Sequence, residues 1–217
     1  MLSNKTALLS VAYLGTVQYY TKLVSFPVVY IEKYENFIKQ TYRNRFSIYA
    51  ANGILSLTIP VAKGTIQKTL IKDIRISYDM NWQKLHWKSI ESAYRSSPFF
   101  EYYIHEFIPF YRSKFQFLFE FNIEIQKVIL SLLKIDKKVL FTDEFYKNGR
   151  GNIFDFRESI HPKKRVNKPD PDFHPVPYKQ VFSSKHGFIG NLSIIDLLFN
   201  EGPNSYDILK SCCSINK

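Results

Sequence analysis

Residues 45–61, with the sequence RFSIYAANGILSLTIPV, predict a β-hairpin. The runs Arg45–Tyr49 and Ile54–Val61, both rich in apolar residues, flank the dipeptide Asn52-Gly53. Asn-Gly between such runs is a strong signal for a tight turn, because both residues tolerate positive φ angles. We therefore expect two antiparallel strands joined at this dipeptide.

Further strands and one short helix are expected around this hairpin. Thr6–Leu14 is predominantly apolar and predicts a buried strand, and Val17–Val24 then fits a short helix. Pro27–Glu32 is rich in β-branched and aromatic residues and predicts a second strand. After the hairpin, Lys68–Ser77 predicts another strand, although Ile71 is out of phase with its alternation.

From residue 79 onward the apolar residues follow a helical period. Asp79 is a candidate N-cap for a helix over residues 80–95, and Ser97-Pro98 has the residue types that open a second helix. Pro109 is expected to bend or end that second helix. Phe117–Lys134 carries the clearest helical stripe of the chain.

Strands followed by helices, without regular alternation, indicate an α+β fold. We expect a mixed sheet from the N-terminal third, packed by helices from the middle and the C-terminus. The chain is interpreted as a single domain over residues 1–217. Its expected parts are a strand-rich part (1–78), a helical part (79–135), a long ordered loop (150–190) and C-terminal helices (191–213) that start at Asn191 and Gly202-Pro203.

The long segment from Asn152 to Asn191 is rich in proline and in mixed charge, yet it keeps many aromatic residues and three of the five histidines. A disordered linker would be poor in aromatics, because it has no core in which to bury them. Long ordered loops are uncommon and usually functional. We therefore expect this segment to be held against the domain and to form part of the site.

Composition points to an anionic partner. Thirty Lys and Arg against 19 Asp and Glu give a formal net charge of +11. The basic residues are spread along the chain, so a nucleic-acid partner is not expected. No apolar run reaches the roughly 20 residues that a membrane span needs. The only two cysteines, Cys212 and Cys213, are adjacent, which is typical of a protein of the reducing cytoplasm.

Tyr42-Arg43-Asn44-Arg45 is the leading candidate for an anion site. Guanidinium groups match carboxylate and phosphate geometry, and in an extended segment Arg43 and Arg45 would project to the same face. Asn44 could orient a neighbouring polar group. The alternative, equally weighted, is that each arginine pairs with an internal acid such as Glu32 or Asp73.

Other candidates come from the predicted strand and helix that follow. Asp73 and Arg75 repeat the alternating charge pattern, and could instead form a solvated face of the sheet. His86 lies beside the apolar stripe of its helix. A histidine there is more often a hydrogen-bonded core residue than a catalytic one, but it could act as a general base in a cleft.

The long loop offers a second group of polar candidates. Arg157 and Lys163 could grip an anion, with His161 beside them and His174 as a further candidate base. Asp172, His174 and His161 have no regular ligand spacing, so no metal is expected. Asp170-Pro171-Asp172 matches the short D-x-D pattern of some sugar transferases, which arises often by chance.

Asp196 stands in Leu192–Phe199, a predicted helix that is apolar on nearly every side. A carboxylate buried in such a helix is costly unless it is paired. A cationic partner such as Arg43 or Arg157 is therefore expected.

Together, these segments resemble the WbqC-like family of bacterial proteins, in a Bacteroidetes-type branch. The resemblance is distributed along nearly the whole chain. It is carried by Ala12-Tyr13-Leu14 with Gln18-Tyr19, Tyr42–Arg45, Leu57–Val61, Ile71–Ile76, Trp82 with His86, Ile90, Ala93-Tyr94 and Pro98-Phe99-Phe100, and Asn191–Phe199. Many members have Gln-Pro-Tyr at the first strand, where this chain has Val11-Ala12-Tyr13.

The resemblance implies a cytoplasmic protein of surface polysaccharide biosynthesis that acts on nucleotide-activated amino sugars by acyl or aminoacyl transfer. On this interpretation Arg43 and Arg45 hold the anionic group, Gln18 and Asn44 orient polar atoms, and His86 or His174 is the base. The alternative is a non-catalytic module that binds an anionic metabolite or a partner protein. No cofactor and no oligomeric state are assigned.

Overall fold

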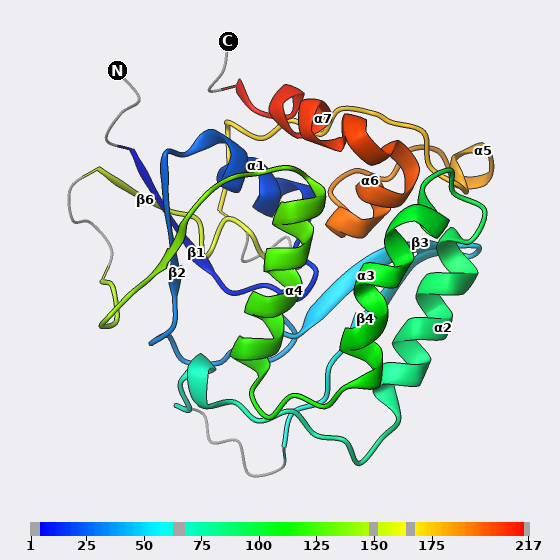
Figure 1. Ribbon diagram of the computed structural model, residues 1–217. Helices are drawn as coiled ribbons and strands as arrows, with labels where there is room; N and C mark the ends of the chain where they lie inside the picture. The colour runs from blue at the N-terminus through cyan, green and yellow to red at the C-terminus, as the bar shows by residue number, and fades with distance from the viewer. Residues whose placement is uncertain (1–4, 63–67, 148–151, 164–167, 215–217) are drawn as a thin grey trace.

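The computed structural model describes residues 5–62, 68–147, 152–163 and 168–214, and it confirms the α+β class. A four-stranded parallel sheet has the order β5-β2-β1-β6, and a separate antiparallel hairpin pairs β3 with β4 (Figure 1). The strands are β1 (Thr6–Ser10), β2 (Val28–Glu32), β3 (Arg45–Ala50), β4 (Gly53–Thr58), β5 (Val139–Phe141) and β6 (Ile153–Asp155). Two strands of the parallel sheet thus come from beyond the N-terminal third.

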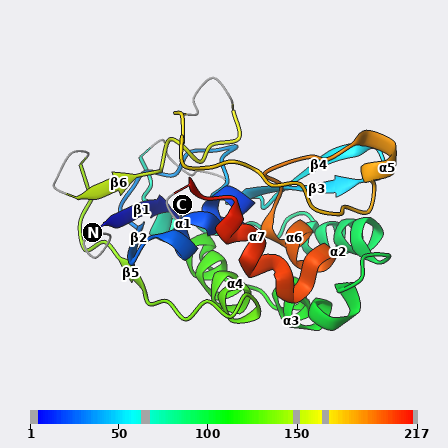
Figure 2. The ribbon, with the colours of Figure 1, turned by 90° about the horizontal axis from the view of Figure 1, so that it is seen from above.

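The hairpin forms as the sequence predicts. The register runs from Arg45 opposite Thr58 to Ala50 opposite Gly53, and Gly53 has a φ angle of 99°. Such an angle is easily adopted by glycine, which has no Cβ. The hairpin extends away from the parallel sheet (Figure 2).

Helix α1 (Val17–Ser25) connects β1 to its parallel neighbour β2. Thr16 caps it, because its side chain accepts a hydrogen bond from the backbone N–H of Tyr19. The polar side chains of Gln18 and Lys22 are buried along with the apolar ones, so α1 is enclosed on all sides. Gln18 and Lys22 are four residues apart and share one face of the helix.

The remaining helices surround α1 and the hairpin. Helix α4 lies with α1 in front of the parallel sheet, and α6 and α7 lie above them (Figures 1 and 2). None of the helices in the described part of the chain is long and apolar enough to cross a bilayer. Their bounds are α2 (Trp82–Tyr94), α3 (Phe100–Arg112), α4 (Leu118–Leu132), α5 (Ser183–His186), α6 (Ile194–Glu201) and α7 (Ser205–Ser211), with 3-10 turns η1 (Ile71–Asp73) and η2 (Gly202–Asn204).

Three local predictions were wrong. Lys68–Ser77 does not form a strand over the residues described, because the 3-10 turn η1 turns both Ile71 and Ile74 into the core. Helix α2 is capped by Asn81 rather than Asp79. Pro109 does not end α3, which continues to Arg112.

The long segment after β6 is largely irregular but firmly attached. Lys22 Nζ lies 2.7 Å from a carboxylate oxygen of Asp170, and Gln18 Nε2 donates to the same carboxylate at 2.8 Å. Tyr49 donates its hydroxyl to the carbonyls of Phe182 and Gly187. These contacts join the described residues of the segment to α1 and to the hairpin. Residues 150–151 and 164–167 lie outside the described part.

Candidate functional site

Three strands of the parallel sheet end at one polar cluster. The register pairs Leu8 with Asp155 and Ser10 with Glu32. Because side chains alternate between the two faces, Ser10, Glu32 and Asp155 project from the same face, at the carboxyl ends of β1, β2 and β6. Ligands of open parallel sheets bind at this end of the strands.

The strand order identifies the position of a crevice at this end. From β1 the chain proceeds through β2 to β5 on one side, and then crosses to β6 on the other side of β1. The direction in which strands are added therefore reverses between β1 and β6. A topological switch point of this kind is where open α/β sheets form their binding crevices.

Arg43 reaches this end of the sheet from the turn before the hairpin. Its Nε donates to Glu35 Oε1 at 2.8 Å, and its Nη2 donates to Glu35 Oε2 at 2.5 Å and to Ser10 Oγ at 2.7 Å. Arg43 and Glu35 are each only 5% exposed. The two-pronged contact fixes the plane of the guanidinium at the carboxyl end of β1.

Arg157 follows β6 and occupies the opposite side of the crevice. Its Nη2 donates to Asp155 Oδ2 at 2.6 Å and to the carbonyl of Tyr146 at 3.0 Å, and its Nη1 lies 3.5 Å from Glu32 Oε2. The guanidinium also lies over the ring of Phe145. These contacts hold Arg157 between the two carboxylates that end β2 and β6.

An open cavity of about 630 Å³, the anion cleft, lies between these two arginines and the loop after β6. A volume of this size accommodates a small metabolite. Its lining contains five cationic side chains, three carboxylates and one histidine. The lining residues are Glu35, Asn36, Ile38, Lys39, Arg43, Phe145, Asp155, Arg157, Glu158, His161, Lys163 and Lys168.

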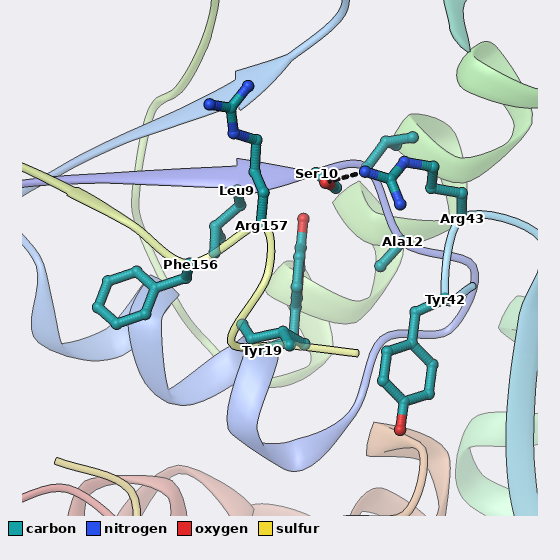
Figure 3. A pocket seen from close by; sticks show the side chains of 10 residues that line it. Leu9, Ser10, Ala12, Tyr19, Tyr42, Arg43, Phe156 and Arg157 are labelled. Atoms are coloured by element: carbon teal, nitrogen blue, oxygen red, sulfur yellow. Dashed lines mark hydrogen bonds between the residues drawn. The ribbon is translucent and has the colours of Figure 1, made fainter. Parts of the chain in front are cut away.

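A much narrower space, the inner chamber, adjoins the anion cleft and shares Arg43 and Arg157 with it. Its free volume is about 10 Å³, which is enough for roughly one water-sized group. Ser10, Tyr19 and Tyr42 are its other residues with polar side-chain groups, and Ala12, Phe156 and Ile160 are among its apolar walls. In Figure 3 the Tyr19 hydroxyl points toward Ser10, to which Arg43 donates a hydrogen bond.

The electrostatics of the anion cleft favour anions. Arg43 pairs with Glu35, Arg157 with Asp155, and Lys168 with Glu158, whereas Lys39 and Lys163 make no ion pair within the described residues. His161 is half-buried, and its pKa is lowered by burial and by the positive charges of Arg43 and Lys163. Its imidazole is therefore neutral at pH 7.

The structure brings together three of the predicted site residues: Arg43, Arg157 and His161. The predicted pairing of Arg43 with Arg45 on one face is wrong, because Arg43 lies in a turn before the strand. Arg45 instead donates to Thr58 Oγ1 across the hairpin at 3.0 Å. The acid that pairs with Arg43 is Glu35, rather than Glu32 or Asp73.

Gln18 and Asn44 are buried away from the lining of the anion cleft. Gln18 holds Asp170 and Asn191, and Asn44 donates to the carbonyl of Ile59 at 3.0 Å. Asp73 and Arg75 are exposed, and Arg75 lies over the ring of Phe117. This arrangement agrees with a solvated surface at Asp73 and Arg75.

His86 is enclosed in the aromatic core at 1% exposure. Its Nδ1 lies 3.0 Å from the hydroxyl of Tyr13, which also contacts the hydroxyl of Tyr111, and the backbone of Thr58 bonds to the ring. Burial lowers the pKa of His86 to about 4. This placement favours the core interpretation of His86 over a catalytic one.

His174 is exposed, and its backbone N–H bonds to the carbonyl of Cys212 beside the C-terminal helix. It does not line the anion cleft. Among the described residues, no group of three or more His, Cys, Asp or Glu is arranged to hold a metal ion. Asp170 of the D-x-D pattern serves instead as the buried partner of Lys22 and Gln18.

Asp196 has partners other than the predicted cation. Its Oδ1 accepts from the Tyr94 hydroxyl at 2.9 Å, and its Oδ2 accepts from the Tyr178 hydroxyl at 2.6 Å and from Gln180 Nε2 at 2.8 Å. Arg43 and Arg157 are instead bound to acids at the anion cleft. The expectation was wrong because neutral donors can satisfy a buried carboxylate as well as a cation does.

Sequence reasoning missed Ser10, Tyr19, Glu35 and Lys39. The missing signal was the parallel pairing of β1 with β2 and β6, because only parallel pairing gathers the residues after several strands at one edge. The run Val17–Val24 between two predicted strands was compatible with this βαβ unit.

Comparison with known proteins gives one family. The model of the WbqC-like protein family matches residues 12–170. No curated protein and no solved structure matches the chain.

Proposed function

Because the chain belongs to the WbqC-like protein family, we propose that it binds a nucleotide-linked or phosphorylated amino sugar in the anion cleft and transfers an acyl or aminoacyl group to it. The proposal places the protein in the cytoplasm, in surface polysaccharide biosynthesis. The observation that carries it is the position of two fixed guanidinium groups, of Arg43 and Arg157, at the switch point of a parallel sheet.

The mixture of charges in the anion cleft fits a substrate that carries both signs. The phosphate of an amino sugar phosphate is an anion, which would lie against Arg43 and Arg157, with Lys39 and Lys163 adding positive potential. The amine of the same substrate is a cation at neutral pH. Glu158 would hold it, since its carboxylate is 58% exposed and lines the anion cleft.

The proposed transfer needs a base and a hydrogen-bond donor. Glu158 first takes one proton from the bound ammonium and releases it to water, so that the neutral amine can attack the carbonyl carbon of the acyl donor. The N–C bond forms, the bond to the leaving group breaks, and the leaving group departs with its bonding electrons. Glu158 then takes the second proton that the nitrogen loses and passes it to the leaving group. His161 Nδ1 accepts from the backbone N–H of Lys163 at 3.0 Å, so the neutral ring carries its proton on Nε2 and can donate it to a substrate oxygen.

Binding measurements on four single variants test this assignment. Lys39→Ala and Lys163→Ala should each weaken binding of glucosamine 6-phosphate about three- to tenfold, since both lysines are cationic groups of the lining. Lys84→Ala, at an exposed position of α2, is the matched control and should leave binding unchanged. Glu158→Gln should weaken binding of the free amine but not of its N-acetyl derivative. Equal affinities for all four variants would reject the assignment.

A non-catalytic binding module is the second candidate. It is favoured by the burial of His86 among neutral partners and by the internal acids that already pair with both arginines. On this alternative the protein binds glucosamine 6-phosphate tightly, but no acyl donor is consumed. Incubation with acyl and aminoacyl donors, followed by mass spectrometry of the sugar, distinguishes the two functions.

A further inference from the structure

Tyr19 is a buried tyrosine of α1 that lines the inner chamber, whereas the hydroxyls of Tyr13 and Tyr94 bond to groups within the core. Figure 3 shows the ring rising from α1, with the hydroxyl pointing toward Ser10. Burial raises the pKa of Tyr19, and the nearby negative charge of Glu35 raises it further. The phenol therefore remains protonated and can act as a hydrogen-bond donor.

The present partner of this hydroxyl is a poor one. The Tyr19 hydroxyl oxygen lies 3.4 Å from Gln126 Oε1 on α4, whereas hydrogen bonds between oxygens are usually 2.5–3.0 Å. In addition, the Nε2 of Gln126 is buried and has no partner among the described residues. A buried N–H without an acceptor destabilises the folded state.

A half-turn of the Gln126 amide would remove this conflict. The two ends of an amide have nearly the same shape, and they are assigned from the hydrogen bonds around them. After the turn, Nε2 faces the Tyr19 oxygen and donates to it. The Tyr19 proton is then free to point into the inner chamber. A carbonyl left with an unfilled position is better tolerated than a buried N–H.

We propose that the inner chamber is a subsite for one terminal oxygen of a phosphate monoester, and that Tyr19 donates a hydrogen bond to this oxygen. Gln126 is the positioning residue that holds the Tyr19 hydroxyl. This inference rests on the proposed function and narrows its substrate class to a phosphorylated amino sugar, as distinct from a nucleotide-linked one.

The size and the polar lining of the chamber lead to the monoester. About 10 Å³ admits one oxygen but no larger group, so the remaining oxygens stay in the anion cleft. Arg43 and Arg157 line both spaces, so the oxygens that remain outside lie beside these two residues. A phosphate bound in this way places one unsubstituted oxygen in the inner chamber and two in the anion cleft. Only a phosphate monoester has three unsubstituted oxygens.

The test compares glucosamine 6-phosphate, inorganic phosphate and UDP-glucosamine by isothermal titration calorimetry. Tyr19→Phe should weaken the binding of glucosamine 6-phosphate and of inorganic phosphate about tenfold, which is the effect of losing one buried hydrogen bond. It should change the affinity for UDP-glucosamine less than twofold. Tyr20→Phe is the matched control. It removes a phenol that is equally buried on the same helix but does not line the chamber.

A double-mutant cycle separates positioning from general stability. Gln126→Met alone should weaken the binding of glucosamine 6-phosphate about threefold. Added to Tyr19→Phe, it should cause no further loss of affinity. A purely structural role of Gln126 would give the same loss in both backgrounds.

The outcomes also separate this inference from the proposed function. If the wild-type protein binds glucosamine 6-phosphate and Tyr19→Phe binds it equally well, the chamber subsite is rejected and the proposed function stands. If Tyr19→Phe loses the same affinity for glucosamine 6-phosphate as for UDP-glucosamine, the specificity for a monoester is rejected. If the wild-type protein binds no phosphorylated sugar at all, both proposals fail together.

Discussion

Glu35 and Asp196 are two buried carboxylates whose surroundings differ in kind. Glu35 meets the guanidinium of Arg43 and lies beside an open cavity. Asp196 is completely buried and meets only neutral donors, from Tyr94, Tyr178 and Gln180. Burial raises the pKa of Asp196, although its three hydrogen bonds act in the opposite direction.

This difference separates a binding region from a structural one. A charged pair beside a cavity can exchange its partner for a ligand, whereas a carboxylate enclosed by donors of its own chain has no such freedom. The donors of Asp196 include Tyr178 and Gln180, so this residue holds residues 178–180 of the long segment against α6. We infer that Glu35 belongs to the ligand chemistry and Asp196 to the attachment of the loop.

The largest expected effect on stability comes from removing the carboxylate of Asp196. Asp196→Ala leaves the hydroxyls of Tyr94 and Tyr178 without their carboxylate acceptor, and it removes one of the two acceptors of Gln180 Nε2, which keeps the carbonyl of Ile189. Each unsatisfied group costs about 1–3 kcal/mol, and partial relaxation reduces the sum, so we expect the free energy of unfolding to fall by about 3–4 kcal/mol. Urea denaturation followed by circular dichroism measures it.

Asp207→Ala is the control for Asp196→Ala. Asp207 is exposed on α7, and its replacement should change the free energy of unfolding by less than about 0.5 kcal/mol. A loss below about 1 kcal/mol for Asp196→Ala would show that the network can rearrange. In that case the contrast between the two carboxylates would disappear.

Much of the fold was predictable because its signals are local. The Asn52-Gly53 turn, the stripe of Phe117–Lys134 and the strand at Pro27–Glu32 all appear in the structure within a few residues. Lys68–Ser77 was not predictable, since an apolar run in two phases fits either a strand or a turn. The packing of Ile71 and Ile74 decides between them.

The site was predictable only in part, because it is assembled by pairing between distant strands. Arg43 and Arg157 could be selected as anion ligands from their residue type, but nothing local shows that they line the same cleft. Glu35 and Tyr19 gain their meaning only from the parallel sheet. His86 shows the reverse case, in which a residue type suited to catalysis serves the core.

His86 extends the comparison to a buried base with neutral partners. Its pKa is about 4 when folded and has an ordinary value of 6.5, so between these values the unfolded chain binds more protons. The free energy of unfolding should therefore fall as the pH drops from 6.5 to 4, by up to roughly 3 kcal/mol from this group. In His86→Gln this part of the pH dependence should be absent.

The measurement is the difference between the stability curves of the wild-type protein and His86→Gln from pH 4 to pH 8. His105→Gln provides the control, because His105 is exposed on α3. Parallel curves for the wild-type protein and His86→Gln would mean that His86 is protonated in the folded state. The case for a purely structural His86 would then fail.

The smallest expected effect concerns Arg45, the neighbour that the sequence could not distinguish from Arg43. Arg45 makes an exposed hydrogen bond to Thr58 and lies outside the lining of the anion cleft. Arg45→Ala should lower the free energy of unfolding by less than about 0.5 kcal/mol and leave the affinity for glucosamine 6-phosphate within twofold. Arg43→Lys keeps the charge but loses the two-pronged contact with Glu35. It should weaken the binding of glucosamine 6-phosphate at least fivefold. A tenfold loss for Arg45→Ala would extend the ligand site onto the hairpin, and it would restore the arginine pair that the strand pattern suggested.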